Sequence, residues 1–320
     1  MSKKHPIIAI TGSAGAGTTT VRHVFSDIFR RQGVTPQIIK GDCFHRHEKP
    51  EMDRLIYESV QRGNPITYFG PEANLFEKQE QVFAQYAKTG RAEIRHYIKD
   101  KDDALEFGQA VGSFTPWEKV EAGSDLLFYE GLHGGAAAHS WTRRKANPAH
   151  LPQTSAKGKQ ERRGKSEGIN AAQHVDLLIG VVPAVNLEWI QKIHRDCSRD
   201  GCTVETTTAT ILRRMRDYIH FIVPQFALTD INFQRMPLVD TSHPFIARDI
   251  PTADESIVII HFRDPHRFNF PDLQQRIPGA FMSRPNTMVV PGGKMRLSMR
   301  VICTPLIREM MENKTAKGRK

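Results

Sequence analysis

Short apolar runs alternate along the chain with longer stretches in which apolar residues recur every three or four positions. The runs predict buried strands and the longer stretches predict helices, which is the order typical of an α/β fold with a mostly parallel sheet and helices on both faces. The expected strands are Pro6–Thr11, Gln37–Lys40, Leu126–Tyr129, Val175–Val182, Ser256–Phe262 and Thr287–Val290. The expected helices are Val21–Arg31, Glu51–Gln61, Phe76–Ala87, Leu187–Arg199, Val204–Ile222 and Lys294–Glu312.

One stretch interrupts this alternation. Residues 139–173 are rich in Ala, Lys, Arg, Gln, Ser and Gly and hold few aliphatic side chains. Such a composition cannot bury enough apolar surface to order itself, so we expect an exposed, mobile insert. The sequence therefore predicts a single domain over residues 1–312, interrupted by a basic insert at about 139–173 and followed by a disordered basic tail at 313–320.

The net charge of +10 is concentrated in these two segments. Arg143–Glu167 carries eight basic and two acidic residues, and Lys314–Lys320 carries four basic residues, which together account for the whole excess. The charge therefore gives no reason to expect a nucleic-acid partner for the rest of the chain. No apolar run approaches the roughly 20 residues that span a bilayer, so we expect no membrane segment and a cytoplasmic location.

The strongest local motif is a glycine-rich turn between the first strand and the first helix. Glycine permits positive φ, and successive N–H groups together with a helix N-terminus form a cradle for phosphates. Thr18 stands where such loops usually carry a lysine, so a cation for the phosphates must come from elsewhere. A turn without ligand and a dinucleotide-binding turn are the alternatives. The expected ATP-binding residues are Gly12, Ser13, Ala14, Gly15, Ala16, Gly17, Thr18, Thr19 and Thr20.

Two carboxylates follow predicted strands. Asp42 comes after the second strand and Glu130 ends the third, and ligands bind beyond the carboxyl ends of parallel strands. Asp42 could accept a proton from a hydroxyl that attacks the γ-phosphorus of ATP, or it could only cap a helix. Glu130 could hold Mg²⁺ together with the hydroxyl of Thr19, or it could only cap a turn.

The predicted helix Leu187–Arg199 has one apolar face and one charged face. The charged face carries Lys192, Arg195, Asp196 and Arg199 at helical spacing. Such a face is commonly a solvated set of ion pairs. Here it also offers the cation that the glycine-rich turn lacks.

Taken together, these motifs resemble the phosphoribulokinases of the short bacterial type, in their non-thiol-regulated branch. The resemblance extends from the first residues into the closing helix and is interrupted chiefly by the insert. The matching segments are His5–Thr18, Gly41–Arg46, Phe128–Gly134, Val185–Asp196, Asn232–Pro237, Val239–Ser242, Ile250–Ser256 and Val289–Lys294.

The resemblance implies a phosphate-loop kinase fold and ATP-dependent phosphorylation of the C1 hydroxyl of D-ribulose 5-phosphate, giving ribulose 1,5-bisphosphate for the Calvin cycle. The catalytic residues that it implies are Asp42, Lys192 and Asp196. The implied ligands of Mg²⁺ are Thr19, Glu130 and Asp196. The residues implied to bind the sugar phosphate are His45, Lys49, Arg195 and Arg199.

Three positions depart from the family pattern where the sugar phosphate is expected to bind. Lys49 replaces an arginine, Asp53 replaces a lysine, and Asp200 replaces an arginine. Ala16 stands where plant-type enzymes carry a regulatory cysteine, so we expect no thiol switch at that position.

The resemblance also implies a homo-octamer with NADH and AMP as effectors. Arg31 and Arg284 match positions associated with NADH at subunit contacts, although His261 stands where another arginine is expected. Two other functions stay open at this point. One is a kinase for another sugar phosphate or a uridine-kinase-like nucleoside kinase, and the other is a regulator that binds a nucleotide.

Overall fold

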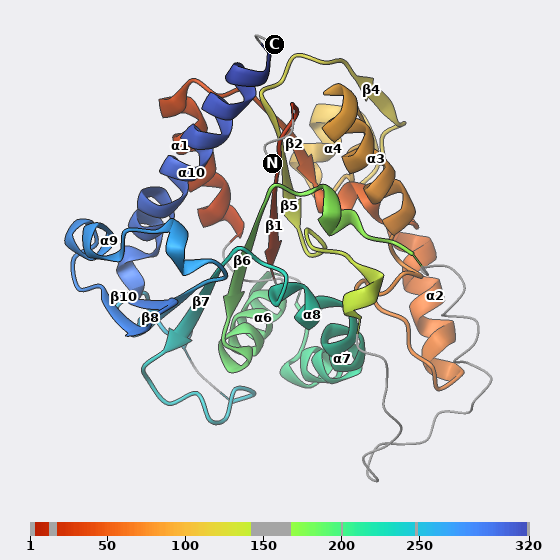
Figure 1. Ribbon diagram of the computed structural model, residues 1–320. Coiled ribbons are helices and arrows are strands. Elements are labelled where there is room, and N and C mark those ends of the chain that lie inside the picture. The colour runs from red at the N-terminus through yellow and green to blue at the C-terminus, as the bar shows by residue number, and fades with distance from the viewer. Residues whose placement is uncertain (1–3, 13–17, 142–167, 200, 247–248, 319–320) are drawn as a thin grey trace.

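An eight-stranded sheet forms the centre of the protein in the computed structural model (Figure 1). The structure describes residues 4–12, 18–141, 168–199, 201–246 and 249–318. Five neighbouring strands pair in parallel, and the last three pair antiparallel at one edge. In sheet order the strands are β2 (Pro36–Lys40), β5 (Leu126–Gly131), β1 (Ile7–Gly12), β6 (Leu177–Pro183), β7 (Ile231–Pro237), β8 (Ser256–Phe262), β10 (Thr287–Pro291) and β9 (Phe281–Arg284).

Helices connect the strands and pack on both faces of the sheet. A separate two-stranded antiparallel sheet consists of β3 (Ala92–Ile94) and β4 (Glu118–Val120), and a short 3-10 turn, η1 (Gly41–Phe44), follows β2. The described helices are α1 (Thr18–Gln32), α2 (Lys49–Gln61), α3 (Phe76–Thr89), α4 (Lys101–Phe107), α6 (Val185–Arg199), α7 (Val204–Asp217), α8 (Val223–Phe226), α9 (Phe270–Arg276) and α10 (Met295–Gly318).

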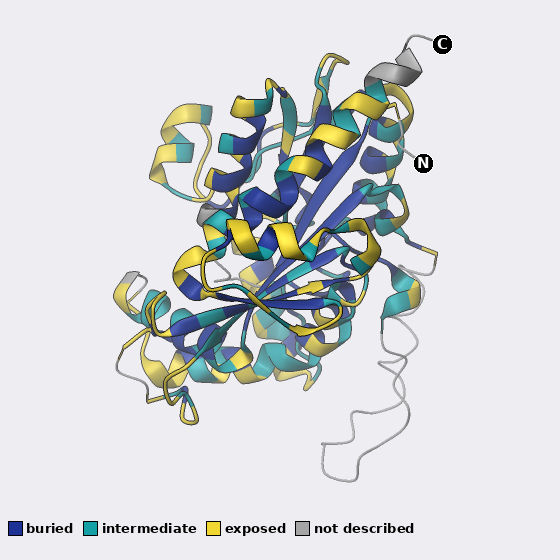
Figure 2. Ribbon diagram, turned by 60° about the vertical axis from the view of Figure 1, so that its left-hand side comes forward, coloured by how far each residue is buried: buried dark blue, intermediate teal, exposed yellow. Residues whose placement is uncertain are grey.

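Alternate side chains of the strands enter two separate cores. Ile8 and Ile10 of β1 join the core beneath α1 and α10, whereas Ile7 and Ala9 join the core beneath α3. Successive residues of a strand point to opposite faces, so a sheet covered on both sides needs a continuous apolar run. In Figure 2 the central strands are accordingly almost entirely buried. The predicted α/β class is therefore confirmed.

The apolar pattern does not predict β7, although this strand extends the parallel part of the sheet. Polar residues Asn232, Gln234 and Arg235 interrupt its apolar positions, and most of its residues are only half buried. The pattern also does not predict β3, β4, β9, α4 or α9, which are short. Their positions depend on packing rather than on local periodicity.

The ends of the predicted insert belong to the core, which corrects the expected boundaries of 139–173. The Ala138 N–H donates to Ile169 O at 2.8 Å, and Trp141 packs its ring against Phe76 and Phe221. Ile169 and Ala171 are apolar and buried, although they fall within the range predicted as an exposed insert. Residues 142–167 of the predicted insert lie outside the described residues.

The closing helix also extends beyond its predicted end at Glu312. α10 continues to Gly318, so residues 313–318 of the predicted disordered tail are helical. Lys314 anchors this last part, because its ammonium donates to Asp125 O at 2.9 Å and to Asp125 Oδ1 at 3.1 Å. Among the described helices, none is both long enough and apolar enough to cross a lipid bilayer.

Candidate active site

Three of the predicted site residues, Gly12, Asp42 and Glu130, lie together at the carboxyl ends of three adjacent strands. Lys40 of β2 and Ile10 of β1 both pair with Glu130 of β5, and Asp42 follows Lys40 by two residues. Gly12 ends β1 beside them. Residues 13–17 lie outside the described residues, and the side chains of residues 18–20 are not described, so their ATP contacts stay predictions.

Two glycines allow the turns after β2 and β5 to approach each other. A Cβ atom on Gly41 would lie 3.0 Å from Gly131 Cα, and a Cβ atom on Gly131 would lie 2.9 Å from Gly41 Cα. Either Cβ would also lie within 2.6 Å of the Tyr129 hydroxyl. Glycine is therefore required at both positions by close backbone approach rather than by positive φ. This approach sets Asp42 beside Glu130.

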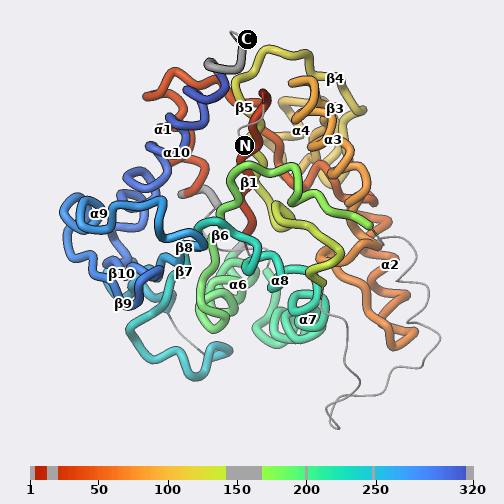
Figure 3. The backbone as a smooth tube through the Cα atoms, in the orientation of Figure 1, coloured from red at the N-terminus to blue at the C-terminus, as the bar shows by residue number. Residues whose placement is uncertain are grey.

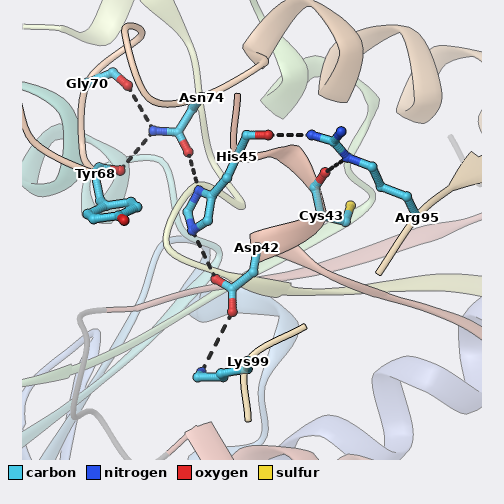
Figure 4. A network of polar contacts seen from close by, with 8 residues as sticks. All are labelled: Asp42, Cys43, His45, Tyr68, Gly70, Asn74, Arg95 and Lys99. Atoms are coloured by element: carbon cyan, nitrogen blue, oxygen red, sulfur yellow. Dashed lines mark hydrogen bonds and ion pairs between the residues drawn. The ribbon is translucent and has the colours of Figure 1, made fainter. Parts of the chain in front are cut away.

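Asp42 lies between two basic side chains, as Figure 4 shows. Its Oδ1 is 3.5 Å from His45 Nε2, and its Oδ2 is 3.7 Å from Lys99 Nζ. Burial alone would raise the pKa of Asp42, but the hydrogen bond and charge of His45, with Lys99, outweigh burial and lower the pKa to about 2. The carboxyl group is therefore ionised and can accept a proton.

His45 is held in one orientation by Asn74. The Asn74 amide donates to Tyr68 O and to Gly70 O, each at 2.8 Å, which directs its Oδ1 to His45 Nδ1 at 3.2 Å (Figure 4). His45 Nδ1 therefore donates a proton, while Nε2 faces the Asp42 carboxylate.

Arg95 supports the turn that carries Asp42. Its Nε donates to Cys43 O at 2.9 Å, and its guanidinium also donates to His45 O. The guanidinium lies 3.6 Å from the ring centroid of Phe114, so it is stacked as well as hydrogen-bonded. Sequence reasoning missed Arg95, Lys99 and Asn74, because no local pattern marks them and they reach the site from segments distant in sequence.

Glu130 has the properties expected of a ligand for a cation. Burial raises the pKa of Glu130, and the charge of Asp42 raises it further, while Arg22 and Lys40 act in the opposite direction. Within the described residues, no hydrogen bond or ion pair reaches its carboxylate. A bound Mg²⁺ would supply a positive partner for the Glu130 carboxylate, because Mg²⁺ commonly takes one or two carboxylates together with phosphate oxygens and water.

The described residues contain no cluster of three or more acidic, histidine or cysteine side chains that could hold a metal by themselves. The residues present fit a metal that is held mainly by its phosphate ligands and by Glu130. Such a site differs from an all-protein cage, which would need more carboxylates.

The charged face of α6 is organised around Asp196. Lys192 donates to Asp196 Oδ2, and Arg195 lies 3.2 Å from Oδ1. Burial lowers the pKa of Lys192 and nearby Arg214 lowers it further, whereas Asp196 acts to raise it. In this structure Asp196 is therefore paired with two cations, and its predicted contact with Mg²⁺ stays a prediction. The side chain of Arg199 is not described.

Arg214 of α7 connects the α6 cluster, formed by Lys192, Arg195 and Asp196, to the Asp42 side of the site. Its charge acts on the pKa of Lys192 and on that of Tyr68, whose ring packs against His45 at a centroid distance of 5.2 Å. Burial raises the pKa of Tyr68 to about 12, so its hydroxyl stays protonated. Sequence reasoning missed Arg214, although its helix was predicted.

Three other predicted residues have no described contact with Asp42, Glu130 or Asp196. Lys49 begins α2 and pairs with Asp53 at 2.7 Å, so the departure at position 53 occupies the ammonium at position 49. Arg31 pairs with Asp27 on α1 at 2.9 Å. Arg284 ends β9, at the opposite edge of the sheet from β2. The effector roles of Arg31 and Arg284 stay predictions.

The family model described as the phosphoribulokinase / uridine kinase family matches residues 7–140 and 165–242. The chain is 49% identical to a phosphoribulokinase of Sinorhizobium medicae. The 314 aligned residues cover 98% of this chain and 99% of the relative. It is 48% identical to the chromosomal phosphoribulokinase of Cupriavidus necator, with 98% of each chain covered.

Among solved structures, the phosphoribulokinase from Rhodobacter spheroides superposes with a TM-score of 0.81 at 46% identity, covering 98% of this chain and 100% of that one. The likeness therefore spans nearly the whole chain. The chain belongs to the phosphoribulokinase / uridine kinase family.

Proposed function

We propose that this chain is a phosphoribulokinase that transfers the γ-phosphoryl group of ATP to the C1 hydroxyl of D-ribulose 5-phosphate. The observation that carries the proposal is the pairing of ionised Asp42 with His45, beside Glu130 and the end of β1. Near-full-length similarity to proteins named phosphoribulokinase supports the choice of acceptor.

The chemistry follows from this placement. Asp42 takes the proton of the C1 hydroxyl as the hydroxyl oxygen bonds to the γ-phosphorus, and the bond from that phosphorus to the bridging oxygen of ADP breaks. Phosphoryl transfer has a loose transition state, so a positioned carboxylate suffices even with a pKa of about 2.

Cations placed on α6 supply what the glycine-rich turn lacks. Lys192 is largely buried, so its ammonium acts in a low dielectric, where it stabilises the negative charge of the transferred phosphoryl group more than it would in water. Arg195 is more exposed, which supports a role in binding the phosphate of the sugar. Mg²⁺ held by Glu130 would neutralise the β- and γ-phosphate oxygens.

A nucleoside acceptor is supported less well. Lys192, Arg195 and Arg214 lie around one carboxylate, Asp196, so positive charge is left over for a phosphate. A nucleoside carries no phosphate to use it. A homo-oligomer with NADH and AMP as effectors remains part of the proposal through the resemblance alone.

The proposal is tested by measuring ADP release from ATP and Mg²⁺ with ribulose 5-phosphate or with uridine as acceptor. We expect kcat/KM for ribulose 5-phosphate to exceed that for uridine by at least about 100-fold, because the uridine lacks the phosphate that the cations bind. Folded protein without turnover of ribulose 5-phosphate, or with a preference for uridine, would contradict the proposal.

A further inference from the structure

A single buried amide connects the two segments that end at the candidate nucleotide site. Gln225 lies in α8 and its side chain is fully buried. Figure 3 shows α8 beside the chain that follows β5, the strand that ends with Glu130 and Gly131. Neither the α6 cluster nor the Asp42 turn uses this residue.

The oxygen of the Gln225 amide accepts two hydrogen bonds. Thr11 Oγ1, at the end of β1, lies 3.2 Å from it and shares its one hydroxyl proton between this oxygen and Leu132 O. The backbone N–H of Gly135, in the turn after β5, donates to it at 2.9 Å. One atom therefore joins the residue before Gly12 to the turn after Glu130.

The nitrogen of the same amide fixes its orientation. It donates to Phe221 O at 2.8 Å and to Leu132 O at 3.2 Å, and it lies 3.3 Å from His133 Nδ1. A rotated amide would set its oxygen against the two carbonyl oxygens and its NH₂ group against the Gly135 N–H, and it would lose those three bonds. Each polar atom of Gln225 is thus satisfied, as a buried network requires.

The connected segments also touch each other directly. Leu132 O, the other acceptor of the shared Thr11 hydroxyl proton, lies 3.0 Å from Oγ1, and a Cβ atom on Gly134 would lie 2.7 Å from Ile10 O. The turn is therefore pressed against β1 immediately before the predicted phosphate-binding residues. A π-helical turn, Tyr218–Ile222, leads into α8, and such turns are frequent at functional sites.

We propose that Gln225 is a positioning residue for nucleotide and magnesium binding. It fixes the position of the end of β1 relative to the turn after Glu130. It thereby sets the distance between the bound phosphates and the Glu130 carboxylate that would hold the metal. This inference rests on the proposed function only in taking the ligand to be a nucleotide with Mg²⁺.

The test measures the affinity of the full chain for MgADP by titration calorimetry. Gln225→Met keeps the side-chain volume and removes all the amide hydrogen bonds, and we expect roughly 10- to 100-fold weaker binding of MgADP. KM for ATP should rise by a similar factor, whereas KM for ribulose 5-phosphate should change by less than about twofold.

Ile222→Ala is the matched control. Ile222 is also fully buried, three residues away, but its side chain makes no hydrogen bond to the turn. It should lower the unfolding temperature while leaving MgADP affinity within about twofold of wild type. Thr11→Val removes one donor without changing shape and should weaken MgADP binding in the same direction by a smaller factor.

Unchanged MgADP affinity in folded Gln225→Met, or an equal loss in Ile222→Ala, would overturn the inference. If Gln225→Met does not fold, Thr11→Val decides, and wild-type affinity in that variant overturns it. A wild-type protein that binds MgADP yet does not phosphorylate ribulose 5-phosphate would instead contradict the proposed function. The two failures are therefore distinguishable.

Discussion

At the scale of single residues, the charge state of Asp42 is set by its neighbours more than by its burial. His45 and Lys99 together outweigh the desolvation that would otherwise raise its pKa. The orientation of His45 depends in turn on Asn74, whose amide is fixed by two carbonyl groups. A base with a pKa of about 2 stays ionised across the physiological range, so an acid limb of activity between pH 5 and 7 would belong to another group.

Removal of the Asp53 carboxylate should strengthen binding of the sugar phosphate. Asp53→Asn frees the Lys49 ammonium, which is now paired at 2.7 Å on an exposed part of α2. Exposed pairs are worth about 0.2–1 kcal/mol, so we expect KM for ribulose 5-phosphate to fall by a factor of about 1.4 to 5 with KM for ATP unchanged. Glu58→Gln, which breaks the pair with Arg62 at the other end of the helix, is the control. An unaltered KM in Asp53→Asn would show that Lys49 does not meet the sugar phosphate.

His133 should make stability depend on pH. Burial lowers its pKa to about 3, whereas in the unfolded chain it takes up a proton near its ordinary pKa of about 6.5. The unfolded state thus binds more protons in this range, and the free energy of unfolding should fall as the pH is lowered from about 6.5 to about 3.

Denaturant titrations at several pH values measure the contribution of His133. His133→Asn should remove the part of the pH dependence that comes from this side chain. Parallel curves for wild type and His133→Asn would contradict the account.

At the scale of elements, the site depends on how closely two strand ends approach. Gly131→Ala would place a Cβ atom 2.9 Å from Gly41 Cα, and a backbone atom cannot move aside as the end of a side chain can. We expect a loss of about 1–3 kcal/mol in the free energy of unfolding and a lower kcat, because the turn that carries Asp42 must shift. Thermal unfolding and steady-state kinetics measure the two effects.

Gly63→Ala is the control for this prediction. Gly63 has a positive φ of 67°, but a Cβ atom there would meet nothing within 4 Å. This variant should lose stability through backbone strain and keep kcat. A Gly131→Ala protein with wild-type kcat would contradict the role of the close approach.

Elements that the sequence predicts correctly are those with strong periodicity or long apolar runs. The apolar runs of β1, β5 and β6 are unbroken because these strands are buried on both faces. In β7, polar residues stand between the apolar ones, so the apolar pattern does not predict this strand. The candidate site divides in the same way. Asp42 and Glu130 follow strands and can be found locally, but Arg95 reaches the Asp42 turn from 52 residues away, a contact that only the fold creates.

At the scale of the whole molecule, the charge excess and the proposed catalytic residues occupy different parts of the chain. Replacing residues 142–167 by a short Gly/Ser linker should leave kcat/KM within about twofold, because the flanking residues are already joined by Ala137 and Asn170. The same replacement should reduce salt-sensitive retention on DNA, since it removes most of the positive excess. Trp141→Ala, which removes a ring packed on the core, should lower stability instead. A large loss of kcat/KM on replacement would assign these residues a part in the site.

The most direct test of the account is the kcat of Asp42→Asn with ATP, Mg²⁺ and ribulose 5-phosphate. The amide keeps the shape of the side chain but cannot take the proton of the C1 hydroxyl, so kcat should fall by roughly 10²- to 10⁴-fold. MgADP affinity should stay close to wild type, because Asp42 is not assigned to hold the nucleotide. A kcat within about threefold of wild type in folded Asp42→Asn would contradict the assignment of Asp42 as the base.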